Sequence, residues 1–451
     1  MAKDLRSFIE KNDGLILRVP KTVRRLDLSV LITQANRPVL FEKIDGHDGW
    51  SVADLLFRDR IAQAAVLETE PERVTKVLAE RLALPPRAPS LVGTAPWKEN
   101  IHKAGAFDLR RIPGFRHGTR DPCEALIVMN VCRAPDGGPA NLSFTRLSPF
   151  EERRATMLIG SSPHQRAILE GWKARGEPMP MACVVGTHPA YEIMASYSVP
   201  DHLDRFGELD IVVNLIGETV ETVACETVPL EVPAHAELVI EGYVHGDELR
   251  EDGPGPSQAL YYLPGATQQP VFEATMLAHR TGPILRQHNT LLYSDHQPLI
   301  SLPHEALLLE RLRAETADVR DVYYVPWGGT LACVVQVSPR ADGEVRNLLM
   351  LVLGQRWPSC KLAIAVDEDV DIGTAEDLVW SLATRVDPTR DLFVVPDAKT
   401  HPIDPTARQT GDHPRDVVTG KWGIDATKPS LQHPEARARF ERTVPPGFGE
   451  V

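Results

Sequence analysis

The chain has 451 residues, 43% hydrophobic and 25% charged, which is the composition of a soluble globular protein with room for about three domains. A net charge of -13 without any dense Lys/Arg block argues against nucleic acid and anionic membranes as partners. No stretch approaches the roughly 18 apolar residues of a membrane span, and the amino terminus has no apolar signal core, so we expect a cytoplasmic protein.

Residues 1–95 are predicted to form an N-terminal α/β domain. Short apolar runs such as Pro38-Val-Leu-Phe41 precede a stretch at residues 71–82 whose apolar residues recur at helical spacing. The segment Leu84-Pro-Pro-Arg-Ala-Pro89 then breaks the pattern, because proline lacks a backbone donor and restricts the residue before it. We place a domain boundary there.

Residues 96–305 have mostly strand patterns and are predicted to form the central domain. The apolar run Ala125-Leu-Ile-Val-Met-Asn-Val131 and the alternating run Asn141-Leu-Ser-Phe-Thr-Arg146 flank a turn at Asp136-Gly-Gly138, which indicates a hairpin. Further strands are expected at residues 211–216, 221–228, 236–244 and 271–279. Helices are expected at residues 162–173 and 189–194, as inserts on a sheet or barrel.

Residues 306–451 are predicted to form a third domain. Helical patterns at residues 304–314 and 375–384 alternate with strands at 322–325, 331–337 and 361–366, which favours an α/β layer with parallel strands. The acidic run Asp367-Glu-Asp-Val-Asp371 is either a solvated turn or a cation site. After Pro429 we expect an extended tail.

Several kinds of site have no motif in this sequence. The six cysteines are widely spaced with no Cys-x-x-Cys pair, so we interpret them as reduced core thiols rather than as zinc ligands or a disulfide framework. A phosphate-cradling Gly-rich loop and a Gly-x-Ser-x-Gly elbow are both missing from the sequence, which argues against a nucleotide hydrolase and a serine esterase.

Two places carry candidate chemistry. Ser162-Pro-His-Gln165 has the signature of a helix start, whose free backbone amides suit a phosphate or a metal-bound phosphate. His164 in that first turn is then a ligand or a solvated helix residue. Arg146 lies on a predicted strand in a poorly basic region, and a guanidinium can hold a carboxylate through two parallel hydrogen bonds.

Six segments together resemble the UbiD family of flavin-dependent decarboxylases, in that family's order, and the resemblance extends from about residue 95 onward. They are Asn141 to Arg146, His164, Val185-Gly-Thr-His-Pro-Ala190, the turn Val199-Pro-Asp201, residues 231–243, and Lys421-Trp-Gly-Ile-Asp-Ala-Thr-Lys-Pro429. The resemblance implies an α/β multidomain fold: an N-terminal α/β region, a central split β-barrel of flavin-reductase-like type, and a C-terminal α/β domain. It also implies a homo-oligomer, either a dimer or a hexamer.

The same resemblance implies prenylated FMN, supplied by a UbiX-like flavin prenyltransferase. Its phosphate would be bridged to the protein by a divalent metal, with Mn²⁺ expected and K⁺ nearby. Asn141 and His164 would be metal ligands, and Arg146 would touch the flavin and orient the substrate acid. The implied cofactor-binding residues are Ser143, Phe144, Thr145, Arg146, His164, Gln165, Arg166 and Lys421.

Two positions depart from the family pattern. Where the family has a glutamate as third metal ligand, this chain has Arg205, so either Asp204 or Glu208 supplies the oxygen or Arg205 holds the phosphate directly. Of the family's two catalytic acids, the first matches Asp252, but the second, the usual proton donor, matches Ser257.

Serine cannot act as an acid near neutral pH. Asp252, a water held by Ser257, or His296 would then supply the proton. The expected catalytic residues are therefore Arg146, Asp252 and Ser257. The resemblance implies a reversible carboxy-lyase acting on an aromatic or α,β-unsaturated carboxylic acid. The alternative is a UbiD-like paralogue that serves as a binding or structural subunit of a carboxylase assembly.

Overall fold

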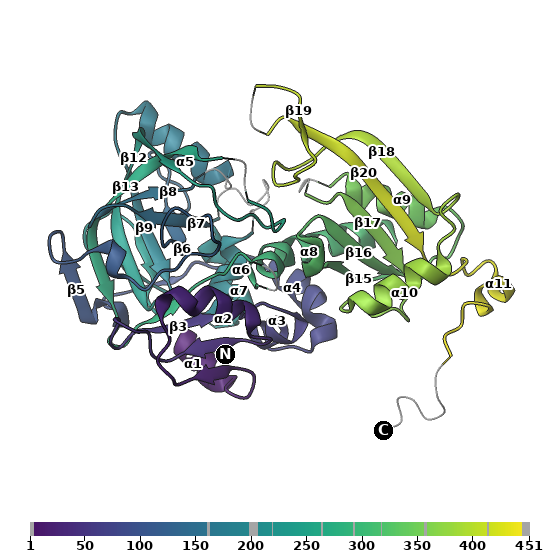
Figure 1. Ribbon diagram of the computed structural model, residues 1–451, viewed down its shortest axis with the longest axis horizontal. Helices are drawn as coiled ribbons and strands as arrows, with labels where there is room; N and C mark the ends of the chain where they lie inside the picture. Colours follow the sequence, from purple (N-terminus) through teal and green to yellow (C-terminus); the bar gives the residue numbers. More distant parts are fainter. Residues whose placement is uncertain are drawn as a thin grey trace. The chain divides into compact units, whose positions relative to one another are not determined.

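The computed structural model describes residues 4–159, 163–197, 206–218, 220–262, 265–291, 294–316, 318–355, 359–412 and 415–443. The chain divides into two compact units, Met1–Pro303 and His304–Val451, which are described one at a time (Figure 1). In the described ranges, no helix has both the length and the apolar character that crossing a membrane requires.

A closed antiparallel β-barrel forms the centre of the first unit (Figure 1). Around the barrel the strands run in the order β12 (Leu238–Asp252), β9 (Met179–Val185), β6 (Leu126–Cys132), β7 (Asn141–Pro149), β8 (Arg154–Met157) and β13 (Thr267–His279). Pairing of β12 with β13 closes it, and β5 (Asn100–Lys103) adds to β13 outside the ring. The predicted central split β-barrel is confirmed.

The predicted hairpin is formed by β6 and β7, which pair antiparallel with Asn130 opposite Ser143. Because side chains alternate along a strand, Ser143 and Thr145 lie on one face of β7, while Phe144 and Arg146 lie on the other. Predicted cofactor-binding residues on the same face of β7 can contact the same ligand, whereas residues on opposite faces contact different neighbours.

The expected strand at residues 211–216 is wrong, because this run is part of helix α7 (Glu208–Ile216). Asp210 accepts a hydrogen bond from the backbone N–H of Gly207 at 2.8 Å, which caps the helix start, and Gly217 ends it with a φ of 75°. Eight of its nine residues are buried, and the run at 211–216 is too short for periodicity alone to separate a buried helix from a buried strand.

A second sheet of the first unit joins N-terminal strands to a later one. Its order is β1 (Leu17–Val19), β2 (Val39–Phe41), β3 (Ser51–Asp54) and β14 (Ile284–Arg286). Strands β3 and β14 are parallel neighbours, so their last residues, Asp54 and Arg286, meet at one edge of the sheet. A boundary near residue 95 stays a prediction.

The rest of the first unit consists of helices and a small sheet. The N-terminal helices are α1 (Leu5–Lys11), α2 (Leu28–Gln34), α3 (Arg60–Leu67) and α4 (Val74–Leu82). The helix expected at residues 71–82 is therefore confirmed, with a 3₁₀ turn over its first three residues. The small sheet contains β4 (Ser90–Val92), β10 (Glu221–Ala224) and β11 (Glu231–Pro233). Helices α5 (Pro163–Ala174) and α6 (Pro189–Ala195) lie where helices were expected.

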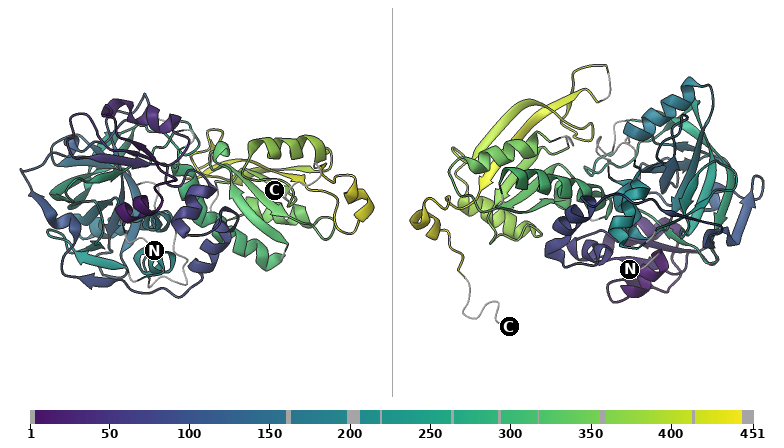
Figure 2. Two further views of the ribbon diagram at one scale, coloured as in Figure 1. Left: turned by 90° about the horizontal axis from the view of Figure 1, so that it is seen from below. Right: turned by 180° about the vertical axis from the view of Figure 1, so that it is seen from behind.

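The second unit has the predicted α/β layer. Its strands run in the order β15 (Val319–Tyr324), β16 (Ala332–Val337), β17 (Leu362–Val366), β20 (Val417–Ala426) and β18 (Leu392–Lys399), with β19 (Arg408–Gln409) also on β20. The three central strands are parallel. Helices α8 (His296–Glu315) and α9 (Glu344–Leu353) pack on one face and α10 (Ala375–Arg385) on the other, as can be followed in Figure 2.

Three expectations for this region need correction. Helix α8 begins at His296 rather than at residue 304, because it continues through Pro303. The tail forms a short helix, α11 (Pro434–Ala438), where an extended chain was expected. In the acidic run, Asp367 is buried and accepts hydrogen bonds from the Lys428 N–H and the Arg437 guanidinium, whereas Glu368 and Asp371 are exposed, as expected for a solvated turn.

Candidate functional site

Arg146 and Asp252 are brought together from two barrel strands. Nη2 of Arg146 on β7 donates to Oδ1 of Asp252, the last residue of β12, at 2.7 Å. The hydroxyl of Ser148 donates to Oδ2 of the same carboxylate at 3.2 Å. The Asp252 side chain is only 1% exposed and that of Arg146 11% exposed, so the pair is shielded from water. Two of the predicted catalytic residues thus form one buried unit.

The loop after β12 closes against this pair. A Cβ atom on Gly255 would lie 1.8 Å from Nη1 of Arg146, so any larger residue would require the guanidinium or the loop backbone to move. Ser257 is buried two residues further on, and its N–H donates to the Tyr261 carbonyl at 2.8 Å. The position of the predicted proton donor is therefore close to the pair in the chain, but it carries a hydroxyl that cannot protonate a carbanion.

Two histidines lie near this loop. Nε2 of His296, at the start of α8, is 3.5 Å from the side-chain nitrogen of Gln258. Nδ1 of His117 accepts a hydrogen bond from the N–H of Thr290 at 3.2 Å. Burial lowers the pKa of His117 to about 3 and that of His296 to about 4, so both imidazoles are neutral near pH 7. Sequence reasoning missed His117, which stands alone in a loop without a motif.

Asn141 lies against Glu208, the first residue of α7. Nδ2 of Asn141 donates to Oε1 of Glu208 at 3.3 Å, and the N–H of Leu142 donates to Oε2 at 2.9 Å. Burial raises the pKa of Glu208 to about 7. Of the two alternatives for the missing oxygen ligand, Glu208 is thus placed beside a predicted ligand. Asp204 and Arg205 lie outside the described residues.

Three of the predicted cofactor-binding residues lie at the start of α5, where one is buried and two are exposed. Gln165 is buried, and its Oε1 accepts a hydrogen bond from the Thr145 hydroxyl at 3.3 Å. The side chains of His164 and Arg166 are exposed, and Ser162 lies outside the described residues. Within the described ranges, no three or more His, Cys, Asp or Glu side chains gather as a metal site. Oxygen ligands for a hard cation could come from Asn141 and Glu208.

Buried polar atoms on β7 fit a polar ligand such as a flavin. Within the described part of the chain, the Ser143 hydroxyl and Nε of Arg146 are buried without a hydrogen-bond partner. Phe144 packs edge-on against the His288 ring, with 4.7 Å between the ring centres. Buried polar groups without partners are costly, so a bound group that satisfies Nε of Arg146, on the face shared with Phe144, would be stabilised here; the Ser143 hydroxyl lies on the opposite face of β7.

Lys421 belongs to β20 of the second unit. Its side chain is buried, and Nζ donates to the Leu353 carbonyl at 2.9 Å. Burial lowers the pKa of this lysine. Its predicted contact with the cofactor stays a prediction.

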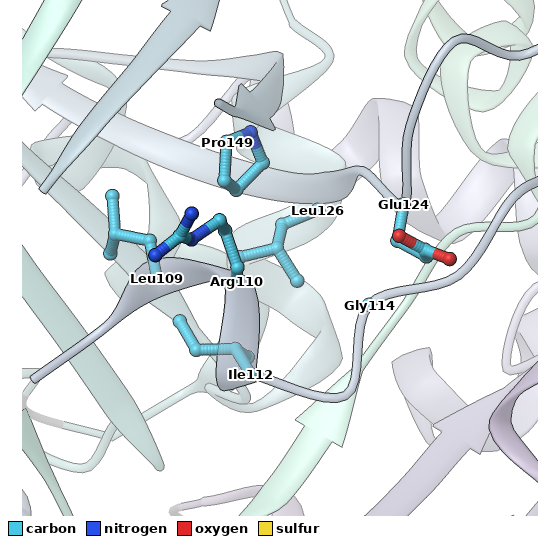
Figure 3. Close-up of a pocket in the computed structure, with 7 residues that line it drawn as sticks. All are labelled: Leu109, Arg110, Ile112, Gly114, Glu124, Leu126 and Pro149. Carbon is cyan, nitrogen blue, oxygen red and sulfur yellow. The ribbon is translucent and has the colours of Figure 1, made fainter. Parts of the chain in front are cut away.

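A small cavity lies beside the ends of β6 and β7 (Figure 3). It is lined by Leu109, Arg110, Ile112, Gly114, Glu124, Leu126 and Pro149. Its volume of about 30 Å³ suits a water molecule and is far below the several hundred Å³ of a typical ligand site. We therefore do not assign substrate binding to it.

The chain matches two family models. The 3-octaprenyl-4-hydroxybenzoate carboxy-lyase Rift-related domain (UbiD) matches residues 90–291, and the corresponding C-terminal domain matches residues 297–426. The chain is also 26% identical to an anhydromevalonate phosphate decarboxylase from Methanosarcina mazei, with 97% of each chain covered.

Two solved structures of one enzyme are similar over almost the whole chain. The UbiD-class enzyme HmfF from Pelotomaculum thermopropionicum in complex with FMN is 30% identical with a TM-score of 0.88, covering 99% of this chain and 98% of that one. An evolved dimeric form of HmfF in complex with prFMN is 28% identical with a TM-score of 0.86, covering 100% and 98%.

Proposed function

Because the chain belongs to the UbiD family, we propose that it is a reversible decarboxylase of an aromatic or α,β-unsaturated carboxylic acid that depends on prenylated FMN. The observation that carries the proposal is the buried pair of Arg146 on β7 and Asp252 on β12, with Phe144 on the same face of β7 as Arg146. Similar structures that contain FMN and prenylated FMN support the choice of cofactor.

The bound cofactor would supply an electron sink for the carbanion-like state that forms when CO₂ leaves. The guanidinium of Arg146 would orient the substrate carboxylate, because it can form two parallel hydrogen bonds. Asp252 and Ser148 hold that guanidinium in place through the shared carboxylate. The cofactor would be held by Ser143, Phe144, Thr145, Arg146, His164, Gln165, Arg166 and Lys421.

A divalent metal, with Mn²⁺ as our choice and K⁺ as a second cation, would be held by Asn141, His164 and Glu208 and would offset the charge of the cofactor phosphate. The contact between Asn141 and Glu208 supports this ligand set, since both offer oxygen atoms to a hard cation. The cofactor would come from a UbiX-like flavin prenyltransferase, and the protein would act as a dimer or hexamer.

The first test is co-production of the protein with a flavin prenyltransferase, followed by absorbance spectroscopy and assays of CO₂ release. The acids should include aryl acids, α,β-unsaturated acids and anhydromevalonate phosphate, the last taken from the name of the M. mazei relative. We expect a modified-flavin spectrum and turnover of at least one acid. Arg146→Ala should abolish turnover, and Arg146→Lys should restore little of it, because an ammonium lacks the planar fork. Equal rates in wild type and Arg146→Ala would remove this residue from the mechanism.

Ser257 favours a second candidate, a UbiD-like subunit without decarboxylase activity in a carboxylase assembly. A serine at the position of the family's proton donor is expected in a protein that has lost decarboxylase activity, because a serine hydroxyl is too weak an acid to protonate the product. A stable colourless oligomer from the same co-production, with no CO₂ release from any acid, would support this second candidate.

A further inference from the structure

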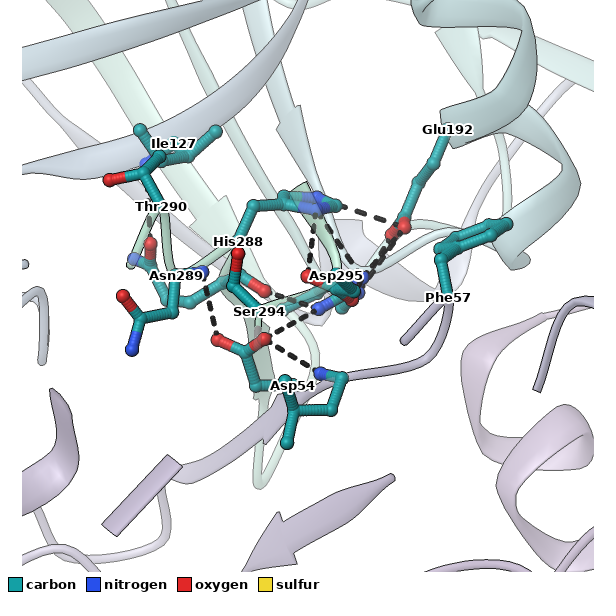
Figure 4. A network of polar contacts seen from close by, with 12 residues as sticks. Asp54, Phe57, Ile127, Glu192, His288, Asn289, Thr290, Ser294 and Asp295 are labelled. Carbon is teal, nitrogen blue, oxygen red and sulfur yellow. Dashed lines mark hydrogen bonds and ion pairs between the residues drawn. The ribbon is translucent and has the colours of Figure 1, made fainter. Parts of the chain in front are cut away.

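Arg286, at the end of β14, is enclosed by three carboxylates from separate parts of the first unit (Figure 4). Glu192 of α6 accepts from Nε at 3.0 Å and from Nη2 at 3.0 Å. Asp295 accepts from Nη2, and Asp54 of β3 lies 3.6 Å from Nη1. All four side chains are at most 1% exposed. The cluster therefore holds three acids and one permanent cation away from water.

The charges in this cluster do not balance if every carboxyl is ionised. His288 also contacts Arg286, but burial and the guanidinium hold its pKa well below the usual range, so this imidazole is neutral. Buried carboxylates that share one cation repel each other, and such groups keep a proton in preference to a second negative charge. In agreement, burial raises the pKa of Glu192 to about 7 and also raises that of Asp54.

The hydrogen bonds at Nη2 of Arg286 indicate which carboxyl group carries the extra proton. This nitrogen carries two hydrogens but faces three acceptors: Oε2 of Glu192 at 3.0 Å, Oδ2 of Asp295, and Nδ1 of His288 at 3.3 Å. Oδ1 of Asp295 is buried and has no hydrogen-bond partner in the described part of the chain. Asp54, in contrast, accepts backbone N–H groups of Leu55 and Asn289 at 2.6 and 3.2 Å. A proton therefore fits best on Glu192, whose Oε2 competes with Asp295 and His288 for the hydrogens of Nη2.

The cluster contacts the proposed reaction site through His288. Figure 4 shows His288 between Glu192 and Asp295, and the ring of His288 packs against Phe144, on the same face of β7 as Arg146. Asp295 directly precedes His296, whose Nε2 faces Gln258 beside Ser257. His296 is neutral at rest, so it can pass a proton on but cannot store one.

We propose that Glu192, beside Asp295, holds a buried proton that is delivered through His296 to the substrate carbon that has lost CO₂, replacing the acid absent at Ser257. This inference rests on the proposed function. A carboxyl O–H bond breaks, His296 takes up that proton on one nitrogen and releases one from the other, and a C–H bond forms with the electron pair that CO₂ leaves behind. The new carboxylate stays beside Arg286 until water returns a proton.

The stored proton can be measured without cofactor or turnover. Infrared spectra of the protein between pH 6 and pH 9 should show the carbonyl stretch of a protonated carboxyl that fades as the pH rises through about 7. Glu192→Gln should remove the Glu192 part of this band, and Glu192→Asp should keep a carboxyl band. The Glu208 carboxyl is expected to contribute a similar band, because its pKa is also raised to about 7. The difference between the spectra of wild type and Glu208→Gln identifies that contribution. An unchanged band in Glu192→Gln overturns the proposal.

Delivery of the proton is tested on the cofactor-loaded enzyme. Glu192→Gln and Asp295→Asn should each lower kcat by roughly 100-fold or more with little change in KM, because general acid catalysis typically contributes that much. Wild-type kcat should fall above about pH 7, and Glu192→Asp should recover part of the activity. If wild type releases CO₂ and both variants keep its kcat and pH profile, the relay is wrong and the proposed function stands. If wild type binds no modified flavin and releases no CO₂, the function and the relay both fail, whatever the infrared band shows.

Discussion

Arg146 and Asp252 form a buried ion pair, with 2.7 Å between Nη2 and Oδ1, that links the middle of β7 to the end of β12. Each was expected in the site on separate grounds, the arginine to orient a carboxylate and the aspartate as the first acid of the family. Their contact means that changing one residue affects both, because removing one partner leaves the other as an uncompensated buried charge.

Asp252→Asn should therefore abolish most decarboxylation while keeping the fold. The amide is close in shape to the carboxylate, but it neither neutralises Arg146 nor serves as an acid or base. We expect kcat to fall by roughly 100-fold or more, as is typical when an acid–base group is lost. Asp252→Ala should also destabilise the first unit, by about 3–5 kcal/mol, the usual cost of breaking a buried pair. CO₂ release and thermal unfolding measure the two effects, and full activity in Asp252→Asn would contradict a catalytic role.

Gly255→Ala tests whether the loop sets the position of the guanidinium. The added methyl would lie 1.8 Å from Nη1 of Arg146, so the guanidinium or the loop must move. A displacement of about 1 Å at a reacting group can cost on the order of 100-fold, so we expect kcat/KM to fall by 10- to 100-fold. Gly93→Ala is the matched control, since its methyl meets nothing within 4 Å. Equal kcat/KM in both variants would show that the loop tolerates the shift.

Much of the fold could be predicted because its elements have clear periodicity or turn chemistry. The β6–β7 hairpin follows from an apolar run, a Gly-containing turn and an alternating run, and its register fixes the faces of Phe144 and Arg146. The helix at residues 211–216 could not be separated from a strand, because the run is short and buried and only its capping residues distinguish it.

The candidate site was predictable only where it depends on short motifs. Arg146, Asp252 and Glu208 are in motif segments or within a few residues of one. The carboxylates around Arg286 come from β3, α6 and the start of α8, and no local pattern joins segments so far apart in the chain. His117 is similar, since only the tertiary fold places it against Thr290.

Divalent metal should stabilise the first unit through Asn141 and Glu208. At a metal concentration 100 times Kd, binding to the folded state alone adds about 2.7 kcal/mol to the free energy of unfolding. We expect Mn²⁺ to raise the unfolding temperature of wild type, and EDTA to reverse the rise. Glu208→Gln and Asn141→Ala should lose most of it. Asp371→Asn, in the exposed part of the acidic run, is the control and should respond like wild type. A wild-type protein that does not respond to Mn²⁺ would argue against the proposed metal.

His117 should make the first unit less stable in acid. Its folded-state pKa of about 3 lies below the usual 6.5, so the folded protein binds this proton less readily than the unfolded chain. Stability from the neutral imidazole is therefore fully present above pH 6.5 and is lost as the pH falls, by about 1.4 kcal/mol per unit, or about 2 kcal/mol by pH 5. His117→Asn keeps an acceptor for the Thr290 N–H without a titrating group. Urea unfolding at pH 5 to 8 should give a steeper pH dependence for wild type than for this variant. Parallel curves would mean that His117 can be protonated without cost in the folded protein.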